Sequence, residues 1–178
     1  MQTGFTSLLG MLEEPLRADG GVKTDNSILL VYLPARELDF REYLVDSFLP
    51  RLDALGHPYR RLDLSGFLFT DFDDETIADL CEDEFEDYRW LRQGLASRVE
   101  KSLTSRIAQL ASEVPGGTII VYSTVALYPL VRFGELLRDL RDLGSRIVLA
   151  FPGEERGGKL HFMNQPDGGN YLAVKLTL

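Results

Sequence analysis

The sequence is poor in the residues that cross-link small proteins or bind metals in them. It contains one cysteine, Cys81, so no disulfide can form within the chain. One cysteine and two histidines are too few for a Cys/His zinc site, which takes four such ligands. We therefore expect no metal and no cofactor, and the reducing cytoplasm is the expected compartment.

Long apolar segments are also missing. The longest uninterrupted apolar run is residues 28–33, far shorter than the roughly 20 residues of a transmembrane helix. The N-terminus has no basic region followed by an apolar stretch, so we expect neither a signal peptide nor a membrane contact. With 178 residues, 44% of them hydrophobic and 26% charged, the chain is expected to form a single globular domain over 1–178.

The charge of the chain is concentrated in one segment. The net charge is −9, and residues 71–87 hold ten acidic residues and no basic one. Outside this acidic window, 18 acids face 19 bases, so the remainder is close to neutral. The window is interpreted as a solvated loop and helix start or, alternatively, as a surface for a basic partner. The second interpretation makes Asp83, Glu84, Glu86 and Asp87 a secondary binding patch.

Hydrophobic periodicity predicts strands that alternate with helices. The predicted helices cover residues 3–17, 38–55 with a kink at Pro50, 85–114 and 130–143. The predicted strands cover residues 28–33, 59–64, 118–122, 146–151, 159–164 and 171–178. In this reading 1–64 is an N-terminal helix and a first βαβ unit, 65–114 is the acidic segment and a long helix, and 115–178 is a second βαβ unit plus a hairpin. The fold class is then α/β: a mostly parallel, doubly wound sheet flanked by helices, with a C-terminal antiparallel hairpin at the edge.

One segment imitates a phosphate-binding loop. Residues 153–159 match GxxxxGK after a strand, but Leu160 stands where a Ser or Thr must hold Mg²⁺. No helix is predicted after it, and the phosphate cradle depends on a helix N-terminus. We interpret the segment as a glycine-rich hairpin or turn. A degenerate nucleotide-binding enzyme or regulator remains the alternative function.

No complete catalytic motif is present in the sequence, although a Ser-His-Asp set could still assemble in space. His57 follows Gly56 in a predicted loop and is expected to face solvent, and His161 is expected to face outward from a strand. The basic face of the long helix raises the possibility of a DNA-binding accessory. Acids are interspersed on that helix and no nucleic-acid-binding motif is present, so we expect no direct nucleic-acid contact.

Candidate contact residues follow the strands of the last third. Arg132 and Glu135 are three residues apart, so they form either a plain ion pair or two contacts for a partner at the carboxyl edge of the sheet. Tyr128 and Pro129 set the turn before them. The other candidates are Phe151, Pro152, Gly153, Glu154, Asn170 and Tyr171.

The order of these blocks resembles a known family. The blocks are Tyr128-Pro129-Leu130-Val131-Arg132, Glu135-Leu136-Leu137, Phe151-Pro152-Gly153-Glu154, Leu160-x-Phe162 and Asn170-Tyr171. Together they resemble the C-terminal signature of BrxB proteins, small components of bacteriophage exclusion (BREX) systems. The N-terminal half agrees more loosely.

The resemblance implies a bacterial, cytoplasmic defence protein encoded beside a phosphatase-like PglZ protein, a large ATPase and a DNA methyltransferase. It implies no enzymatic chemistry. The expected function is therefore that of a non-enzymatic adaptor or assembly subunit of a BREX complex. Its expected partner is a PglZ-like protein or another BREX component.

Overall fold

Parallel strands form the centre of the structure. The computed structural model describes residues 1–16, 26–76, 78, 88–140, 143–166 and 172–178. The strands of the main sheet are β1 (Ser27–Tyr32), β2 (Tyr59–Asp63), β3 (Thr118–Tyr122), β4 (Arg146–Arg156) and β7 (Val174–Thr177). They lie in the order β2-β3-β4-β1-β7, and every neighbouring pair is parallel. The predicted α/β fold with a mostly parallel sheet is confirmed.

The inner strands are buried along their whole apolar runs. All six residues of β1 and all five of β3 are buried. Such continuous apolar runs are typical of parallel strands that are covered on both faces, because neither face meets water. The predicted strand at 28–33 is therefore present as a covered strand up to Tyr32, whereas Leu33 follows the strand and is exposed.

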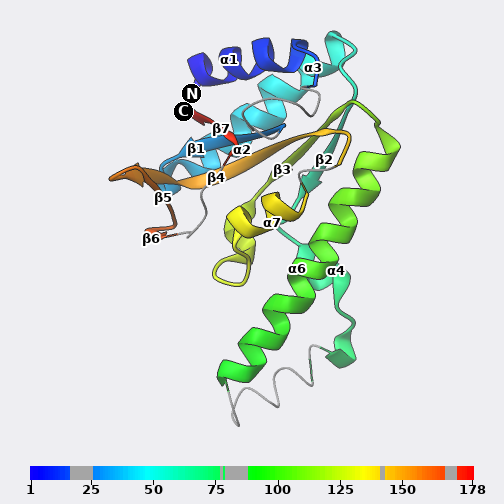
Figure 1. Ribbon diagram of the computed structural model, residues 1–178, viewed down its shortest axis with the longest axis vertical. Helices are drawn as coiled ribbons and strands as arrows, with labels where there is room; N and C mark the ends of the chain where they lie inside the picture. Colours follow the sequence, from blue (N-terminus) through cyan, green and yellow to red (C-terminus); the bar gives the residue numbers. More distant parts are fainter. Residues whose placement is uncertain (17–25, 77, 79–87, 141–142, 167–171) are drawn as a thin grey trace.

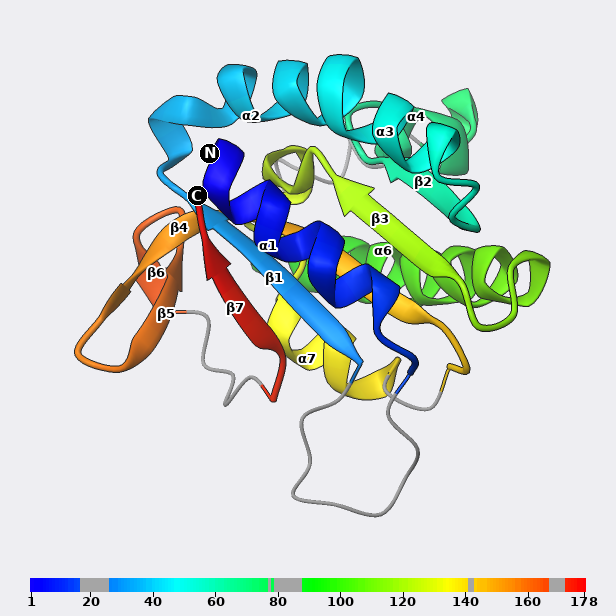
Figure 2. The same ribbon diagram turned by 90° about the horizontal axis from the view of Figure 1, so that it is seen from above.

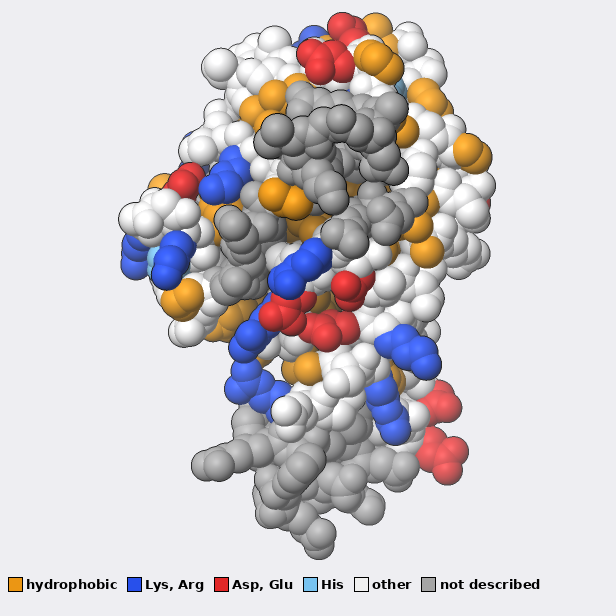
Figure 3. All heavy atoms as spheres, in the orientation of Figure 1, with side chains coloured by type: hydrophobic (Ala, Val, Ile, Leu, Met, Phe, Trp, Pro, Cys, Tyr) orange, Lys and Arg blue, Asp and Glu red, His pale blue; other side chains and the backbone are white. Residues whose placement is uncertain are grey.

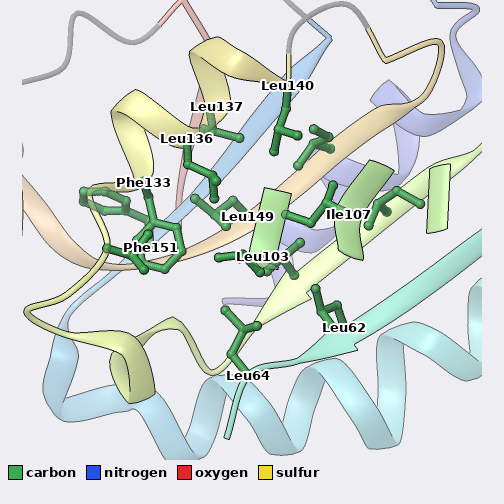
Figure 4. Packing of buried hydrophobic residues seen from close by; sticks show 14 of the residues in the cluster. Leu62, Leu64, Leu103, Ile107, Phe133, Leu136, Leu137, Leu140, Leu149 and Phe151 are labelled. Atoms are coloured by element: carbon green, nitrogen blue, oxygen red, sulfur yellow. The ribbon is translucent and has the colours of Figure 1, made fainter. Parts of the chain in front are cut away.

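Helices cover both faces of the sheet, which gives three layers (Figures 1 and 2). One face is covered by α1 (Gln2–Glu13) and by the helical stretch α2 (Glu37–Tyr43), η2 (Leu44–Phe48) and α3 (Leu49–Ala54). The other face is covered by α6 (Tyr88–Glu113) and α7 (Phe133–Asp139). Figure 4 shows Leu103 and Ile107 of α6 with Leu136 and Leu137 of α7, packed around Leu149 of β4.

A wider helical turn, rather than a measured kink, lies next to Pro50, so the kink itself stays a prediction. The stretch η2 is π-helical and ends at Phe48, two residues before Pro50. Proline has no N–H to donate and its ring crowds the carbonyl four residues earlier, so a wider turn accommodates it. The helix ends where predicted: Gly56 has a φ of 66°, the left-handed conformation that glycine adopts most readily.

The long predicted helix is present as α6, and residues 85–87 of the predicted range lie outside the described residues. Within α6, buried apolar residues recur every three or four positions, at Val99, Leu103, Ile107 and Leu110. This spacing places them on one face, which packs on the sheet. Ahead of this helix, α4 (Phe67–Asp71) is a short helical segment.

The helix predicted over 130–143 is shorter than expected. Residues 124–127 form the 3₁₀ turn η3 (Thr124–Leu127), and α7 begins only at Phe133. The N–H groups of Leu130 and Val131 both donate to the carbonyl of Leu127, which closes a separate turn before the helix. Pro129, joined to Tyr128 by a cis peptide bond, lies in this turn and not in the first turn of the helix.

The predicted pairing of the C-terminal strands is wrong. The structure instead pairs β5 (Lys159–Phe162) antiparallel with the end of β4, and β6 (Gln165–Pro166) with β5. Strand β4 runs on beyond the sheet to Arg156, and Gly157 and Gly158 both have positive φ, which suits a two-residue hairpin loop. Strand β7 pairs parallel with β1. The sequence predicts a hairpin of 159–164 with 171–178 around a turn at 166–169. Of that turn the structure describes only Pro166, which belongs to β6.

The two predicted βαβ units differ in geometry. Strands β3 and β4, joined through α7, are neighbours in the sheet. Strands β1 and β2, joined through α2–α3, are parallel but have β4 and β3 between them. Among the described residues, no helix is both long and apolar enough to cross a lipid bilayer.

Candidate partner-binding hollow

A hollow of about 330 Å³ lies between the β4–β5 hairpin, where Phe162 pairs with Gly153, and the turn that follows η3. Three segments that are distant in sequence line it: α6, the turn between η3 and α7, and the strands β5 and β6. The lining residues are Arg92, Tyr128, Pro129, Val131, Arg132, Phe162, Gln165 and Pro166. We refer to this set as the hollow.

Aromatic side chains form the apolar part of the hollow and its support. Phe162 is buried, and the centre of its ring lies 6.0 Å from that of Tyr128. Behind it, the rings of Phe133 and Phe151 lie 5.3 and 5.2 Å from that of Phe162. Phe151 is therefore placed in the core beneath the hollow, whereas Tyr128 is half-buried and lines it.

Gly153 allows the hairpin to approach the end of β4 closely. A Cβ atom at this position would lie 2.1 Å from the carbonyl oxygen of His161 and 2.8 Å from the ring of Phe151. Only glycine leaves room for this contact. Pro152 accepts a backbone hydrogen bond from Met163 at 3.0 Å. Both Pro152 and Gly153 are buried, so the structure gives them a role in positioning Phe162.

The charged residues that line the hollow, among those described, are Arg92 and Arg132. Both side chains are exposed. Nη1 of Arg132 lies 3.6 Å from Oε1 of Glu135, the ion pair expected from their spacing. Both side chains of this ion pair are exposed, so the pair contributes little to the stability of the fold. The backbone N–H of Arg132 points to Oε1 of Glu100 at 3.5 Å.

The remaining sequence candidates lie elsewhere. Glu154 is on the β4–β5 hairpin, paired with Arg156. Asn170 and Tyr171 lie outside the described residues, and so does the whole secondary acidic patch. Sequence reasoning missed the contribution of Arg92, Gln165 and Pro166, because only the tertiary fold brings α6 and β6 to the turn at 128–132.

A second polar cluster lies at the carboxyl ends of β2 and β3. Oδ1 of Asp63 accepts the backbone N–H of Ser65 at 3.0 Å, and Oδ2 lies 3.8 Å from Nη2 of Arg41. The buried Ser123, with a φ of 58°, finds no hydrogen-bond partner for its hydroxyl within ordinary distance among the described residues. That hydroxyl is still close enough to influence Asp63. Burial, and then the charge of Asp63, raise the pKa of Tyr122.

The two histidines are placed apart from the hollow. Nε2 of His57 lies 2.9 Å from Oγ1 of Thr118, and its half-buried position corrects the expectation that it faces solvent. The parallel pairing of β2 with β3 brings these residues together. Nδ1 of His161 lies 3.2 Å from the carbonyl oxygen of Lys159. In the described part of the chain, no three His, Cys, Asp or Glu residues gather closely enough to share a metal ion.

The segment that imitates a phosphate loop is a hairpin. Residues 153–156 pair with 159–162, and the loop between them is Gly157-Gly158. The strand after the loop takes the place of the helix whose N-terminus a phosphate cradle requires. The interpretation as a glycine-rich hairpin is confirmed.

Comparison with known proteins identifies the family. No curated protein matches the chain. A family model described as "BREX protein BrxB" matches residues 72–176, which is more than half of the chain and includes every residue that lines the hollow. BrxB proteins are components of BREX phage-defence systems. The chain therefore belongs to the BrxB family of BREX proteins.

Proposed function

We propose that this chain is a non-enzymatic assembly subunit of a BREX complex, and that it holds another component of the complex at the hollow. The observation that carries the proposal is the convergence of Tyr128, Pro129 and Arg132 with Phe162 in one concave surface. These residues belong to the ordered blocks that resemble BrxB proteins, and the fold collects them from separate segments.

The composition of the hollow is suited to binding a protein. Protein interfaces are enriched in aromatic residues and arginine at their energetic centre, because such side chains bury large areas with few rotatable bonds or donate several hydrogen bonds. The hollow offers Tyr128 and Phe162 together with two arginines. A phosphatase-like PglZ protein is the first partner to test, since the resemblance implies that it is encoded beside BrxB proteins.

A Tyr128→Ala variant tests the proposal. Truncation of a central aromatic anchor typically costs about 2 kcal/mol of binding free energy, so affinity for the partner should fall roughly thirtyfold. The measurement is calorimetric titration of the purified wild-type chain and variant with each co-encoded BREX protein. Thermal melting of the free variant separates loss of binding from loss of folding.

Leu38→Ala is the matched control. Leu38 is 76% exposed and lies in α2, on the other side of the sheet from α6, so its truncation should leave the affinity unchanged. Two results would contradict the proposal. One is that no BREX protein is retained by the wild-type chain at moderate salt. The other is that Tyr128→Ala, while folded, binds as tightly as the wild type.

A further inference from the structure

We infer that the occupant of the hollow is a short acidic segment of the partner protein, with one or two carboxylates beside an apolar side chain. This rests on the proposed function, because it specifies the chemistry of the partner at the same site. The charge, the shape and the surroundings of the hollow support it in turn.

The charge of the hollow favours carboxylates. Its charged lining residues, among those described, are both arginines. Arg92 makes no ion pair with a described residue, and Arg132 has the weak, exposed pair with Glu135. The planar guanidinium group binds a carboxylate through two parallel hydrogen bonds. A partner carboxylate can therefore replace Glu135 as the ion-pair partner of Arg132 with little loss of free energy.

The apolar part of the hollow favours a side chain next to that carboxylate. Phe162 and Val131 are buried there, with Tyr128 half-buried and Pro129 exposed beside them. A volume of about 330 Å³ is at the lower end for ligand sites, which suits one or two side chains of a peptide. A partner segment with an acidic residue next to an apolar one can contact both the arginines and the apolar lining of the hollow.

The surroundings disfavour a long polyanion such as DNA. On the face shown in Figure 3, acidic side chains gather near the middle of the molecule with basic side chains on both sides of them. The net charge of the chain is −9. The negative charge of the chain would repel a nucleic acid along its whole length. A short segment places its carboxylates only at the two arginines.

Glu135 distinguishes an acidic partner segment from a basic one. Its carboxylate lies 3.6 Å from the guanidinium of Arg132 and competes with an acidic partner for it. Neutralising Glu135 should leave the affinity unchanged or raise it two- to threefold. If Glu135 instead contacts a basic partner, the same change should weaken binding.

The experiment uses the full chain and whichever co-encoded BREX protein the wild type binds, starting with the PglZ-like protein. Arg92→Gln and Arg132→Gln should each weaken binding about tenfold, the usual scale for a lost charge-assisted hydrogen bond. Glu135→Gln should not weaken it. Arg138→Gln, an exposed arginine in the last turn of α7 that does not line the hollow, should match the wild type.

The outcomes separate the two proposals. If the wild type binds but both arginine variants stay within twofold of it, or if Glu135→Gln weakens binding tenfold, the acidic segment is overturned and the assembly role stands. Displacement of the partner by a duplex oligonucleotide, abolished by Arg132→Gln, would identify a phosphate backbone as the occupant instead. If the wild type binds no BREX protein, both proposals fail.

Discussion

At the scale of single residues, Asp63 shows how neighbours decide the properties of one side chain. Burial favours the neutral acid and raises the pKa of Asp63. Hydrogen bonding from Ser65, the nearby hydroxyl of Ser123 and the charge of Arg41 outweigh this effect, so the pKa lies below its ordinary value of 3.8. The carboxylate thus links α2 to the turn that follows β2.

This shift predicts a pH dependence of stability. Because the folded pKa is depressed, the stabilisation is present above the ordinary value of 3.8 and is lost as the pH falls through the lower, folded value. Asp63→Asn should therefore lose less stability than the wild type between about pH 5 and about pH 3. At neutral pH the variant should be destabilised by at most about 1 kcal/mol, since the pair with Arg41 is partly exposed.

Urea unfolding at both pH values measures this effect. Asp46→Asn removes an equal charge from an exposed position of η2 and serves as the control. Equal loss of stability in the wild type and in Asp63→Asn on acidification would show that Asp63 makes no such contribution.

At the scale of elements, the β4–β5 hairpin supports the hollow through Gly153. A Gly153→Ala substitution would place its Cβ 2.1 Å from a backbone carbonyl, which cannot move aside as a flexible side chain could. We expect a loss of about 1–3 kcal/mol in the free energy of unfolding, the usual cost of overpacking. Displacement of Phe162 should also weaken partner binding.

Gly94→Ala is a matched control that should raise the free energy of unfolding, whereas Gly153→Ala should lower it. Gly94 is exposed within α6, and a Cβ there meets no atom within 4 Å. Alanine should stabilise the helix by up to about 1 kcal/mol. Urea unfolding of both variants tests the pair, and a Gly153→Ala protein as stable as the wild type would refute the tight approach of β5.

The helices and strands themselves could be predicted where one period dominates. The 26 residues of α6 carry a clear helical repeat, and the apolar runs of β1 and β3 are too short for helices. The start of α7 was predicted three residues early, because hydrogen bonds to Leu127 close a turn that hydrophobic spacing does not reveal. The hairpin partner was mispredicted because periodicity identifies strands but not which strands pair.

At the scale of the whole molecule, the net charge predicts a weak affinity for nucleic acid. With a net charge of −9 it should bind duplex DNA more weakly than about 100 μM at physiological salt, the weak end of non-specific binding. Electrophoretic mobility shift at two salt concentrations measures this. Micromolar binding that weakens steeply with added salt would show instead that the basic face of α6 contacts DNA.

The candidate site was only partly predictable. Tyr128, Pro129 and Arg132 were candidates from the sequence, whereas Phe162 entered only as part of a family block. Their meeting with Arg92 depends on how α6 crosses the sheet. The prediction that residues 1–178 form one domain, and the roles of Glu154, Asn170 and Tyr171, stay predictions.

The amino-acid sequence alone determined the fold class, most helices and strands, and the family resemblance, because hydrophobic periods, turn residues and ordered motifs are properties of the chain itself. Only the tertiary structure decided the strand order, the parallel place of β7 beside β1 and the hollow between α6, the η3–α7 turn and the β5–β6 strands. The reason is physical: pairing and concavity arise from contacts between residues far apart in sequence, and no local period encodes which distant faces meet.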